Sequence, residues 1–321
     1  MLLLGACGMV AGAYNDPADP ADTAEKIVSV PRGTTPRTLG PVLLAAGVID
    51  DEGDFTTYAR LSKEGACLKA GRHSLNRAMS PHDILTAVCG VPLPEDVPFT
   101  VVEGWRIREI DAALAETGLI HPGDYAAAAA DPSRYKASFP LPTGTLEGYL
   151  YPETYMINRD RFEVGAFIQR QLDLFGERFG VPYQDKVQTR GLSAIVIMAS
   201  MLEREEPKPE NRPMVAGILW KRIDSGWNLG VDATSRYNLA EWNDRQNFLK
   251  ALRDPNDPYN SRLRPGLPPT PIGNPALPSL VAATEPVQSE FWYYQHDGQQ
   301  NLHPSRNVAE HEAFRAKYNV Y

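Results

Sequence analysis

The most apolar stretch of the chain ends in a cluster of glutamates. "GLSAIVIMASML" (191–202) is apolar on almost every side, so a helix formed here would be buried rather than lie on the surface. Glu203 follows Ala199 by four residues and therefore continues one face of that helix. Pro207 and Pro209 end it. The pattern predicts a buried helix with Glu203, Glu205 and Glu206 at its end, close to the core.

The N-terminal third contains an internal repeat. "VPRGTTPRTLGPVLLAAGVI" (30–49) aligns without gaps on "VVEGWRIREIDAALAETGLI" (101–120), placing Gly33 on Gly104 and Gly47 on Gly118. Both copies predict a strand, a tight turn and a helix closed by glycine. Residues 70–90 follow the same order, with Ser80 and Pro81 where a helix would begin. Such units are typical either of small packing modules or of glycan-binding modules, and the pattern leaves both open.

The texture changes near residue 145. "TLEGYLYPETYMI" (145–157) carries Glu147 and Glu153 among tyrosines 149, 151 and 155 in period-two alternation, which predicts a strand. A helix is expected over about 161–178. Tyrosine rings bind sugars by stacking and hydrogen bonding. Packing within a sheet explains the same alternation, so both interpretations stand.

The last third combines a helix with loops rich in polar and proline residues. "MVAGILWKRIDSGWNLGVDATSRYNL" (214–239) predicts an amphipathic helix, a glycine turn and an extended piece bearing Asp232 and Thr234. Nine prolines between 255 and 286 indicate a rigid extended loop framed by Tyr259, Asn260 and Asn274. "FWYYQHDGQQNLHPS" (291–305) predicts a hairpin that turns at Asp297-Gly298, followed by a final helix.

The chain starts with an apolar run of about thirteen residues, fewer than the roughly 20 that span a bilayer. It lacks a basic segment before that run. We expect residues 1–27 to be an apolar start and linker, either the remnant of a membrane anchor or signal or a chance apolar stretch.

Composition excludes several classes of protein. The 321 residues are 43% hydrophobic and 22% charged, values that suggest about two globular domains. A net charge of -8 argues against a nucleic-acid partner, which needs clustered Lys and Arg. The three cysteines lack CxxC spacing and the six histidines lack HExxH, so we expect no metal site. A Cys67–Cys89 disulfide is conceivable.

The glutamates of 203–206 are candidates for proton transfer. A carboxylate at the C-terminal end of a buried helix loses solvation and meets the negative end of the helix dipole, and both raise its pKa. Arg204 would point about 100° away and should not cancel the shift for Glu203. Alternatively, all three glutamates are solvated and balanced by Arg204, Lys208 and Arg212.

Taken together, the later segments resemble the endolytic murein transglycosylase family, also described as YceG-like. The resemblance runs from about residue 28 to 318 and is carried by six ordered motifs: "EGYLYPETY", "ASMLEREE", "LWKRIDSGWNLGVDAT", "PYNSR..GLPPTPIGNP", "SLVAATEP" and "FWYYQHDG". Two departures are visible. The chain has Gly230-Val231-Asp232-Ala233-Thr234 where the family commonly shows Gln-Ser-Asp-Pro-Thr, and Asn307 where a threonine is usual.

The resemblance implies an α+β protein with small LysM-like strand-helix modules at 28–140, including the repeat, and a mixed α/β YceG-like catalytic domain at 141–321. It implies peptidoglycan glycan strands as substrate, peptidoglycan synthases as partners, no cofactor, and a place on the extracytoplasmic face of the bacterial cell membrane, held through the N-terminus. The family's catalytic glutamate falls on Glu203. The substrate-binding candidates are Glu147, Tyr151, Glu205, Asp232, Thr234, Tyr259 and Asn260.

The implied reaction is non-hydrolytic. Glu203 would protonate the oxygen of the β-1,4 bond between N-acetylmuramic acid and N-acetylglucosamine, then take the proton of the muramyl 6-hydroxyl as that oxygen closes on C1. A glycoside hydrolase would instead need a second acid such as Glu147, Glu153 or Asp232. A non-catalytic peptidoglycan-binding protein would explain the repeats without chemistry. A pyridoxal-phosphate lyase is disfavoured because no glycine-rich phosphate loop accompanies Lys221.

Overall fold

The computed structural model describes residues 12–93 and 96–318. They form two compact units: unit 1 holds the described residues up to Val97 together with Ile157–Arg161, and unit 2 holds Pro98–Met156 and the described residues from Phe162 onward. Residues 98–140, predicted to belong with the N-terminal module, therefore lie in unit 2. Most of the apolar start lies outside the described residues. No helix in the described part of the chain is both long and apolar enough to cross a membrane.

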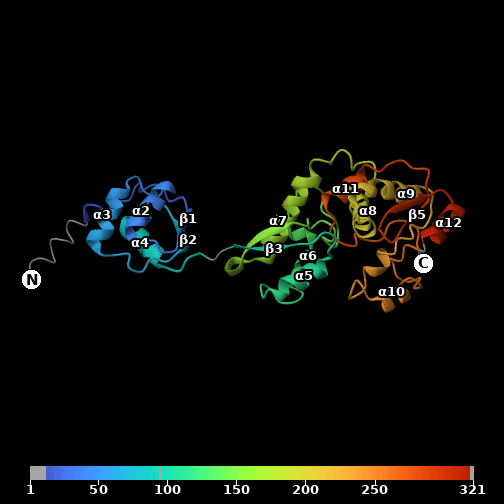
Figure 1. Cartoon of the computed structure of the whole chain (residues 1–321), viewed down its shortest axis with the longest axis horizontal. Helices are drawn as coiled ribbons and strands as arrows, with labels where there is room; N and C mark the ends of the chain where they lie inside the picture. The colour runs from blue at the N-terminus through green and yellow to red at the C-terminus, as the bar shows by residue number, and fades with distance from the viewer. Residues whose placement is uncertain (1–11, 94–95, 319–321) are drawn as a thin grey trace, which may run out of the picture. The chain divides into compact units, whose positions relative to one another are not determined.

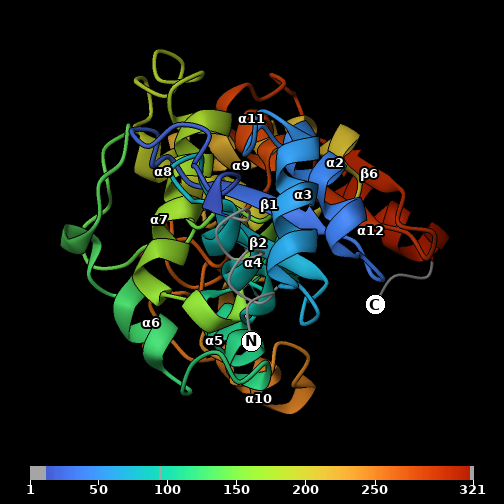
Figure 2. The same ribbon diagram turned by 90° about the vertical axis from the view of Figure 1, so that its left-hand side faces the viewer.

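Unit 1 is a two-stranded sheet with helices. β1 (Lys26–Val30) pairs antiparallel with β2 (Gly71–Leu75), and Val30 lies opposite Gly71. Between them α2 (Pro36–Ala45) and α3 (Glu52–Ser62) pack side by side, and α4 (Pro81–Cys89) follows β2 (Figure 2). Their apolar faces share one core. A disulfide between Cys67 and Cys89 ties the segment before β2 to the end of α4, so the pairing left open by the sequence is present.

The predicted repeat is a repeat of structure. The turn glycines Gly33 and Gly104 have φ values of 79° and 77°, and Gly47 and Gly118, which follow the helices, have 64° and 75°. The second copy consists of β3 (Asp96–Thr100) and α5 (Ile107–Glu116). Ser80 caps α4 with proline at the first helical position, as predicted. In unit 2 a Cβ on Gly273 would lie 2.3 Å from the Gly104 carbonyl oxygen, so this turn packs tightly against a distant loop.

The tyrosine-rich segment differs from its prediction. β4, which pairs with β3, covers only Thr154–Asn158, and residues 145–153 are irregular. Tyr149 and Tyr155 are 2% and 5% exposed and pack against phenylalanines of the unit 2 core, including Phe167 and Phe175 on α7 (Val164–Phe175). The period-two spacing reflects this packing, so these two rings are not available to stack on sugars. Shorter elements here are α6 (Asp124–Ala129), η1 (Pro132–Arg134), η2 (Arg159–Arg161) and η3 (Gly176–Gly180).

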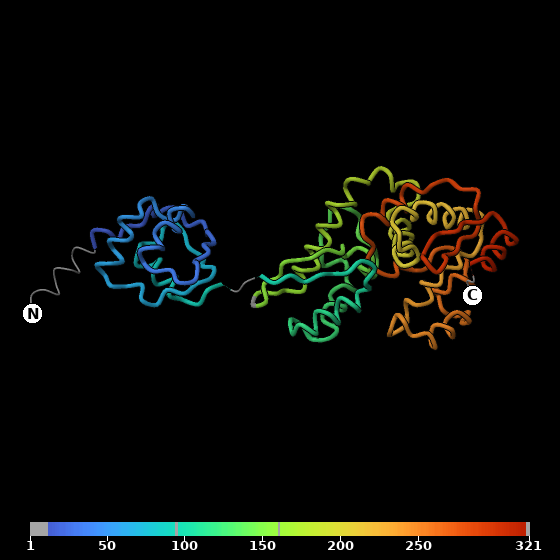
Figure 3. Tube along the Cα trace, in the orientation of Figure 1, coloured from blue at the N-terminus to red at the C-terminus, as the bar shows by residue number. Residues whose placement is uncertain are grey.

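A second group of elements in unit 2 surrounds the glutamates. α8 (Leu192–Glu205) is buried along most of its length and packs against α9 (Arg212–Asp224) and α11 (Leu277–Thr284), with the short η4 (Pro209–Asn211) between α8 and α9 (Figure 1). After η5 (Thr234–Arg236) and α10 (Arg245–Ala251), the chain returns through the proline-rich loop to α11 (Figure 3). The predicted hairpin is β5 (Tyr293–His296) with β6 (Leu302–Ser305), and α12 (Val308–Tyr318) packs on it. The described chain is thus mixed α and β, as predicted.

Candidate functional site

Glu203 lies at the end of α8 with buried partners. Its carboxylate is 2.9 Å from Nη2 of Arg212, and both side chains are nearly inaccessible, at 3% and 5% exposed. The backbone N–H of Ala276, the residue that caps α11, donates to its other oxygen at 2.9 Å. Arg204 points elsewhere, over the ring of Trp242 at 3.6 Å, as the helical angle predicted. Glu203 therefore joins α8 to α9 and to the start of α11.

The electrostatics of Glu203 contain two opposed effects. Burial raises its pKa, in the predicted direction, while the Arg212 charge and the Ala276 N–H lower it. Protonating Glu203 would leave the buried guanidinium without its counter-charge, which is strongly unfavourable. We therefore expect Glu203 to remain a carboxylate near neutral pH. The sequence named Arg212 only as one of three cations balancing solvated glutamates, whereas the structure buries it together with Glu203.

Glu206 is also fully engaged. Its side chain has no exposed surface, and one oxygen lies 2.8 Å from Nε2 of His296 on β5. The Lys208 N–H donates to the other oxygen at 2.9 Å. Burial works to raise the pKa of Glu206, but hydrogen bonds from His296 and Lys208 outweigh it and hold the pKa below its ordinary value.

Glu205 has a different environment. Burial raises its pKa, and the negative charge of Asp232 raises it further. The Tyr294 hydroxyl hydrogen-bonds to the Glu205 carboxyl, which works in the opposite direction. The Glu205 residue as a whole is half-buried. Of the three glutamates, Glu205 combines a raised pKa with a neutral hydrogen-bond partner and an adjacent acid, which is the arrangement expected of a proton-transfer group.

Asp232 and Thr234, both predicted substrate contacts, lie on one loop but differ in exposure. Asp232 is 42% exposed at its side chain and pairs with Arg262 at 2.6 Å. Thr234 is fully buried and hydrogen-bonds to the Val231 carbonyl and to the Ser261 hydroxyl at 2.8 and 2.9 Å. Asp232 is accessible to a ligand, whereas Thr234 holds the loop together.

The three remaining predicted contacts outside Glu147 are also mainly structural. Asn260 is fully buried, and its amide nitrogen donates to the carbonyls of Ala251, Leu252 and Asp254. Tyr259 packs against Tyr237, with ring centroids 4.5 Å apart at an interplanar angle of 35°, and its hydroxyl lies 2.7 Å from Thr270 Oγ1. Tyr151 is 8% exposed. Asn260 and Tyr151 offer almost no surface to a sugar.

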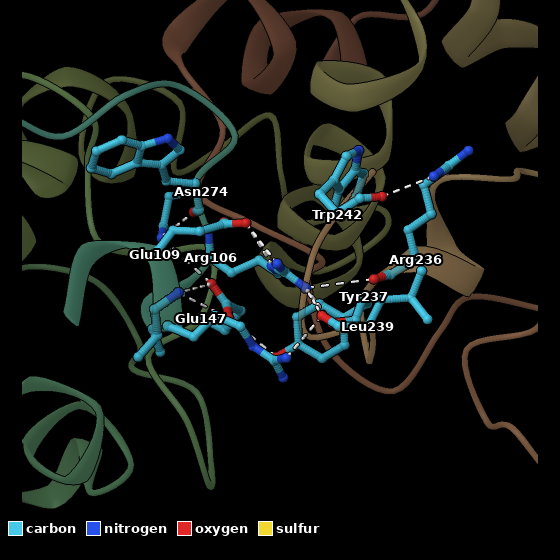
Figure 4. Close-up of polar contacts among 11 residues, drawn as sticks. Arg106, Glu109, Glu147, Arg236, Tyr237, Leu239, Trp242 and Asn274 are labelled. Carbon is cyan, nitrogen blue, oxygen red and sulfur yellow. Dashed lines mark hydrogen bonds and ion pairs between the residues drawn. The ribbon is translucent and has the colours of Figure 1, made fainter. Parts of the chain in front are cut away.

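Glu147 belongs to a separate buried cluster, drawn in Figure 4. It is 2% exposed and accepts from the Ile107 N–H at 3.1 Å and the Tyr237 hydroxyl at 3.1 Å, with Asn274 Nδ2 at 3.5 Å. Burial raises the pKa of Glu147 to about 8, against these donors. Because its carboxyl has no exposed surface on which a sugar could lie, we assign it a structural role instead of the predicted substrate contact.

Arg106 anchors the same cluster and was not singled out by the sequence. It is 1% exposed, and its Nη1 donates to the carbonyls of Tyr237 and Leu239 at 2.7 and 2.8 Å (Figure 4). Its Nη2 pairs with Glu109 at 2.6 Å. Arg106, the residue that precedes α5 in the second repeat copy, therefore fixes the position of the 236–239 loop. In the sequence, the only feature that pointed to Arg106 was its position directly after the Gly104 turn.

Within residues 12–93 and 96–318, no group of three or more His, Cys, Asp or Glu side chains is arranged to hold a metal ion.

Comparison with known proteins assigns the chain to a family. The model of the YceG-like family matches residues 28–317. An endolytic murein transglycosylase of Bacillus subtilis (strain 168) is 23% identical over 332 residues, covering 99% of this chain and 91% of the relative. One of Streptococcus pneumoniae (serotype 2, strain D39) is 26% identical, covering 88% of this chain and 58% of the relative.

A solved structure shares the fold. The crystal structure of a yceG-like protein from Listeria monocytogenes superposes with a TM-score of 0.60 at 23% identity, covering 91% of this chain and 99% of that one. The resemblance inferred from the six motifs is thereby confirmed at the level of the family, and the chain belongs to the YceG-like family.

Proposed function

We propose that the chain is an endolytic murein transglycosylase, a lyase that cleaves the β-1,4 bond between N-acetylmuramic acid and N-acetylglucosamine and leaves 1,6-anhydro ends. The names of the B. subtilis and S. pneumoniae relatives support the substrate class. The observation that carries the chemistry is a glutamate at the end of α8, Glu205, whose pKa is raised by burial and by a neighbouring acid, Asp232. In this role the enzyme would terminate elongation of nascent glycan strands.

We assign proton transfer to Glu205 rather than to Glu203, the residue indicated by the motif alignment. Glu203 is paired with a buried arginine, so protonating it would leave that guanidinium without its counter-charge. Glu205 lies two residues further on, in the last position of α8. Glu203 then acts as a positioning residue that fixes the end of the helix.

The proposed reaction uses one carboxyl group twice. Protonated Glu205 donates to the glycosidic oxygen as the C1–O bond breaks. The resulting carboxylate takes the proton of the muramyl 6-hydroxyl, whose oxygen forms the new bond to C1. Glu205 ends protonated as it began, and no water is consumed. Asp232, with Arg262 beside it, helps to keep Glu205 protonated before the first step.

Two matched variants test this assignment. Glu205→Gln should lower the cleavage rate by about 100-fold or more, because general acid catalysis is typically worth that much. Glu203→Gln should retain a measurable rate but unfold more easily. Mass spectrometry of digested glycan should show anhydro ends. Ends that carry one additional water would favour the hydrolase alternative, with Asp232 as second acid, and full activity of Glu205→Gln would exclude Glu205 as the acid.

We propose that unit 1 is a LysM-like glycan-binding module. Its support is the order strand, helix, helix, strand, with β1 and β2 paired and α2 and α3 between them. Deleting residues 12–93 should weaken binding to insoluble peptidoglycan while short soluble strands are still cut. Unchanged pull-down by the shortened protein would favour the packing-only interpretation.

We propose that the chain works on the extracytoplasmic face of the cell membrane, held through its N-terminus and close to peptidoglycan synthases. The Cys67–Cys89 disulfide supports an oxidising compartment, because structural disulfides are rare in the cytosol. Alkylation of free thiols in freshly lysed host cells tests this placement. Cys67 and Cys89 should be protected until a reductant is added, and their complete alkylation without it would contradict the placement.

A further inference from the structure

Trp227 is a large aromatic side chain left exposed near the proposed acid. It keeps 43% of its surface exposed, although it packs against other aromatic rings. Its ring centroid lies 4.5 Å from that of Trp292 at an interplanar angle of 32°, and 6.2 Å from Tyr293. A tryptophan that is packed on one side and exposed on another offers a flat apolar surface of fixed orientation.

Two basic side chains of α9, Lys221 and Arg222, hold the aromatic pair Trp227–Trp292 in place. Lys221 Nζ lies 4.2 Å from the Trp292 ring centroid and donates to the Glu290 carbonyl at 3.1 Å. Arg222 donates to the Trp292 carbonyl through Nε at 2.9 Å and Nη2 at 2.6 Å, and its Nη1 donates to the carbonyl of Leu229. One guanidinium thus connects the strand that bears Trp292 with the loop that bears Trp227. The orientation of the two indole rings is therefore fixed by contacts with α9.

Arg222 connects this pair to the surroundings of the acid. Its guanidinium donates to the Trp292 carbonyl and lies 5.8 Å from the Tyr294 ring centroid, and the Tyr294 hydroxyl hydrogen-bonds to the Glu205 carboxyl. The positive charge of Arg222 also lowers the pKa of Glu205, so the two side chains are near each other.

We propose that Trp227 and Trp292 form a sugar-stacking subsite that binds a pyranose ring of the glycan strand next to the bond that is cleaved. The apolar C–H face of a pyranose matches an exposed indole, while the polar rim of the sugar stays in water. This subsite rests on the proposed function for its ligand. It adds a binding contribution that the acid itself does not supply.

The test measures binding separately from cleavage. In full-length Glu205→Gln protein, binding of uncrosslinked glycan strands is followed by calorimetry. Adding Trp227→Ala should weaken binding about three- to ten-fold, the range expected for loss of one aromatic stack. Trp227→Phe keeps a stacking ring and should recover most of the affinity. Leu249→Ala is the matched control, because Leu249 is 44% exposed on α10 and distant in sequence from both tryptophans.

A kinetic arm separates this inference from the proposed function. With Glu205 intact, Trp227→Ala should raise KM with little change in kcat, because the subsite contributes to binding and not to proton transfer. If no anhydro ends form but Trp227→Ala still weakens glycan binding, the transglycosylase assignment fails and the subsite stands. If Trp227→Ala binds glycan as tightly as its parent, with an unchanged melting temperature, the subsite is excluded.

Discussion

In the described part of unit 2, three glutamates have raised pKa values, and two of them, Glu147 and Glu205, have contrasting surroundings. Glu147 is surrounded by hydrogen-bond donors from Ile107 and Tyr237 and is 2% exposed. Glu205 lies at the end of a helix beside an acid, Asp232, and the hydroxyl of Tyr294 on β5. A raised pKa therefore identifies desolvation in both cases, and the neighbouring groups, hydrogen-bond donors around Glu147 and an acid beside Glu205, distinguish the two carboxyls.

The largest expected effect separates the two glutamates by activity. Glu147→Gln should leave kcat/KM within about threefold of wild type, since the amide replaces a carboxyl that is already protonated at neutral pH, whereas loss of one catalytic acid costs about 100-fold or more. Cleavage of glycan strands by Glu147→Gln and Glu205→Gln proteins measures the difference. A folded Glu147→Gln protein as inactive as Glu205→Gln would remove the distinction between the two sites.

The next effect compares the arginines of the two regions by stability. Arg106→Gln should lower the free energy of unfolding of unit 2 by about 3 kcal/mol, because it leaves two buried carbonyls and Glu109 without their donor. Arg262→Gln, at the exposed pair with Asp232, should cost less than about 1 kcal/mol. Tryptophan fluorescence during denaturation reports unit 2 alone, since all five tryptophans lie in it: Trp105, Trp220, Trp227, Trp242 and Trp292. Equal losses would contradict the contrast.

The sequence predicted the regular elements of this comparison better than its contacts. The buried helix ending at Glu205, the repeat and the hairpin all follow from local periodicity, turn glycines and capping residues, which depend on few neighbours. Even the direction of the Glu203 shift followed from burial at a helix end. Arg212 was considered only as a cation balancing solvated glutamates, and its buried pair with Glu203 depends on η4, which redirects the chain between the two residues.

The candidate site was harder to predict than the fold. Glu147, Thr234 and Asn260 are polar residues within family motifs, which suggests ligand contact, yet all three are buried and satisfy backbone groups of irregular loops. Polar residues in a loop motif are expected both when they bind a ligand and when they hold the loop together. Sequence spacing does not distinguish them, because burial depends on segments distant in the chain, such as the Asn274 loop beside Glu147.

A pH-dependent effect tests the environment of Glu147. Its pKa is raised from 4.5 to about 8, so the stabilisation from protonated Glu147 is complete below about pH 4.5 and is lost as pH rises to 8. Between pH 5 and 8, wild type should lose up to about 1.4 kcal/mol per pH unit relative to Glu147→Gln. Urea denaturation of both proteins across this range measures the slope. A constant difference would show that the donors around Glu147 outweigh its burial.

The smallest expected effect is on stability near Glu205, and it comes from the neighbouring pair of Glu206 and His296. The raised pKa of His296 gives stability that is complete below about pH 6.5 and lost as pH rises through the shifted value, while the lowered pKa of Glu206 gives stability lost on acidification below about pH 4.5. His296→Gln should therefore cost about 1 kcal/mol near pH 5.5 and less on either side. His82→Gln, at an exposed His–Glu pair, is the control and should change little.

On acidification from pH 5 to 3 the His296 effect should shrink while the Glu147 difference stays constant, because only the former depends on an ionised carboxylate. Urea denaturation of the His296→Gln and Glu147→Gln proteins over that range distinguishes the two regions, and parallel behaviour of the two variants would show that both contain the same kind of buried acid.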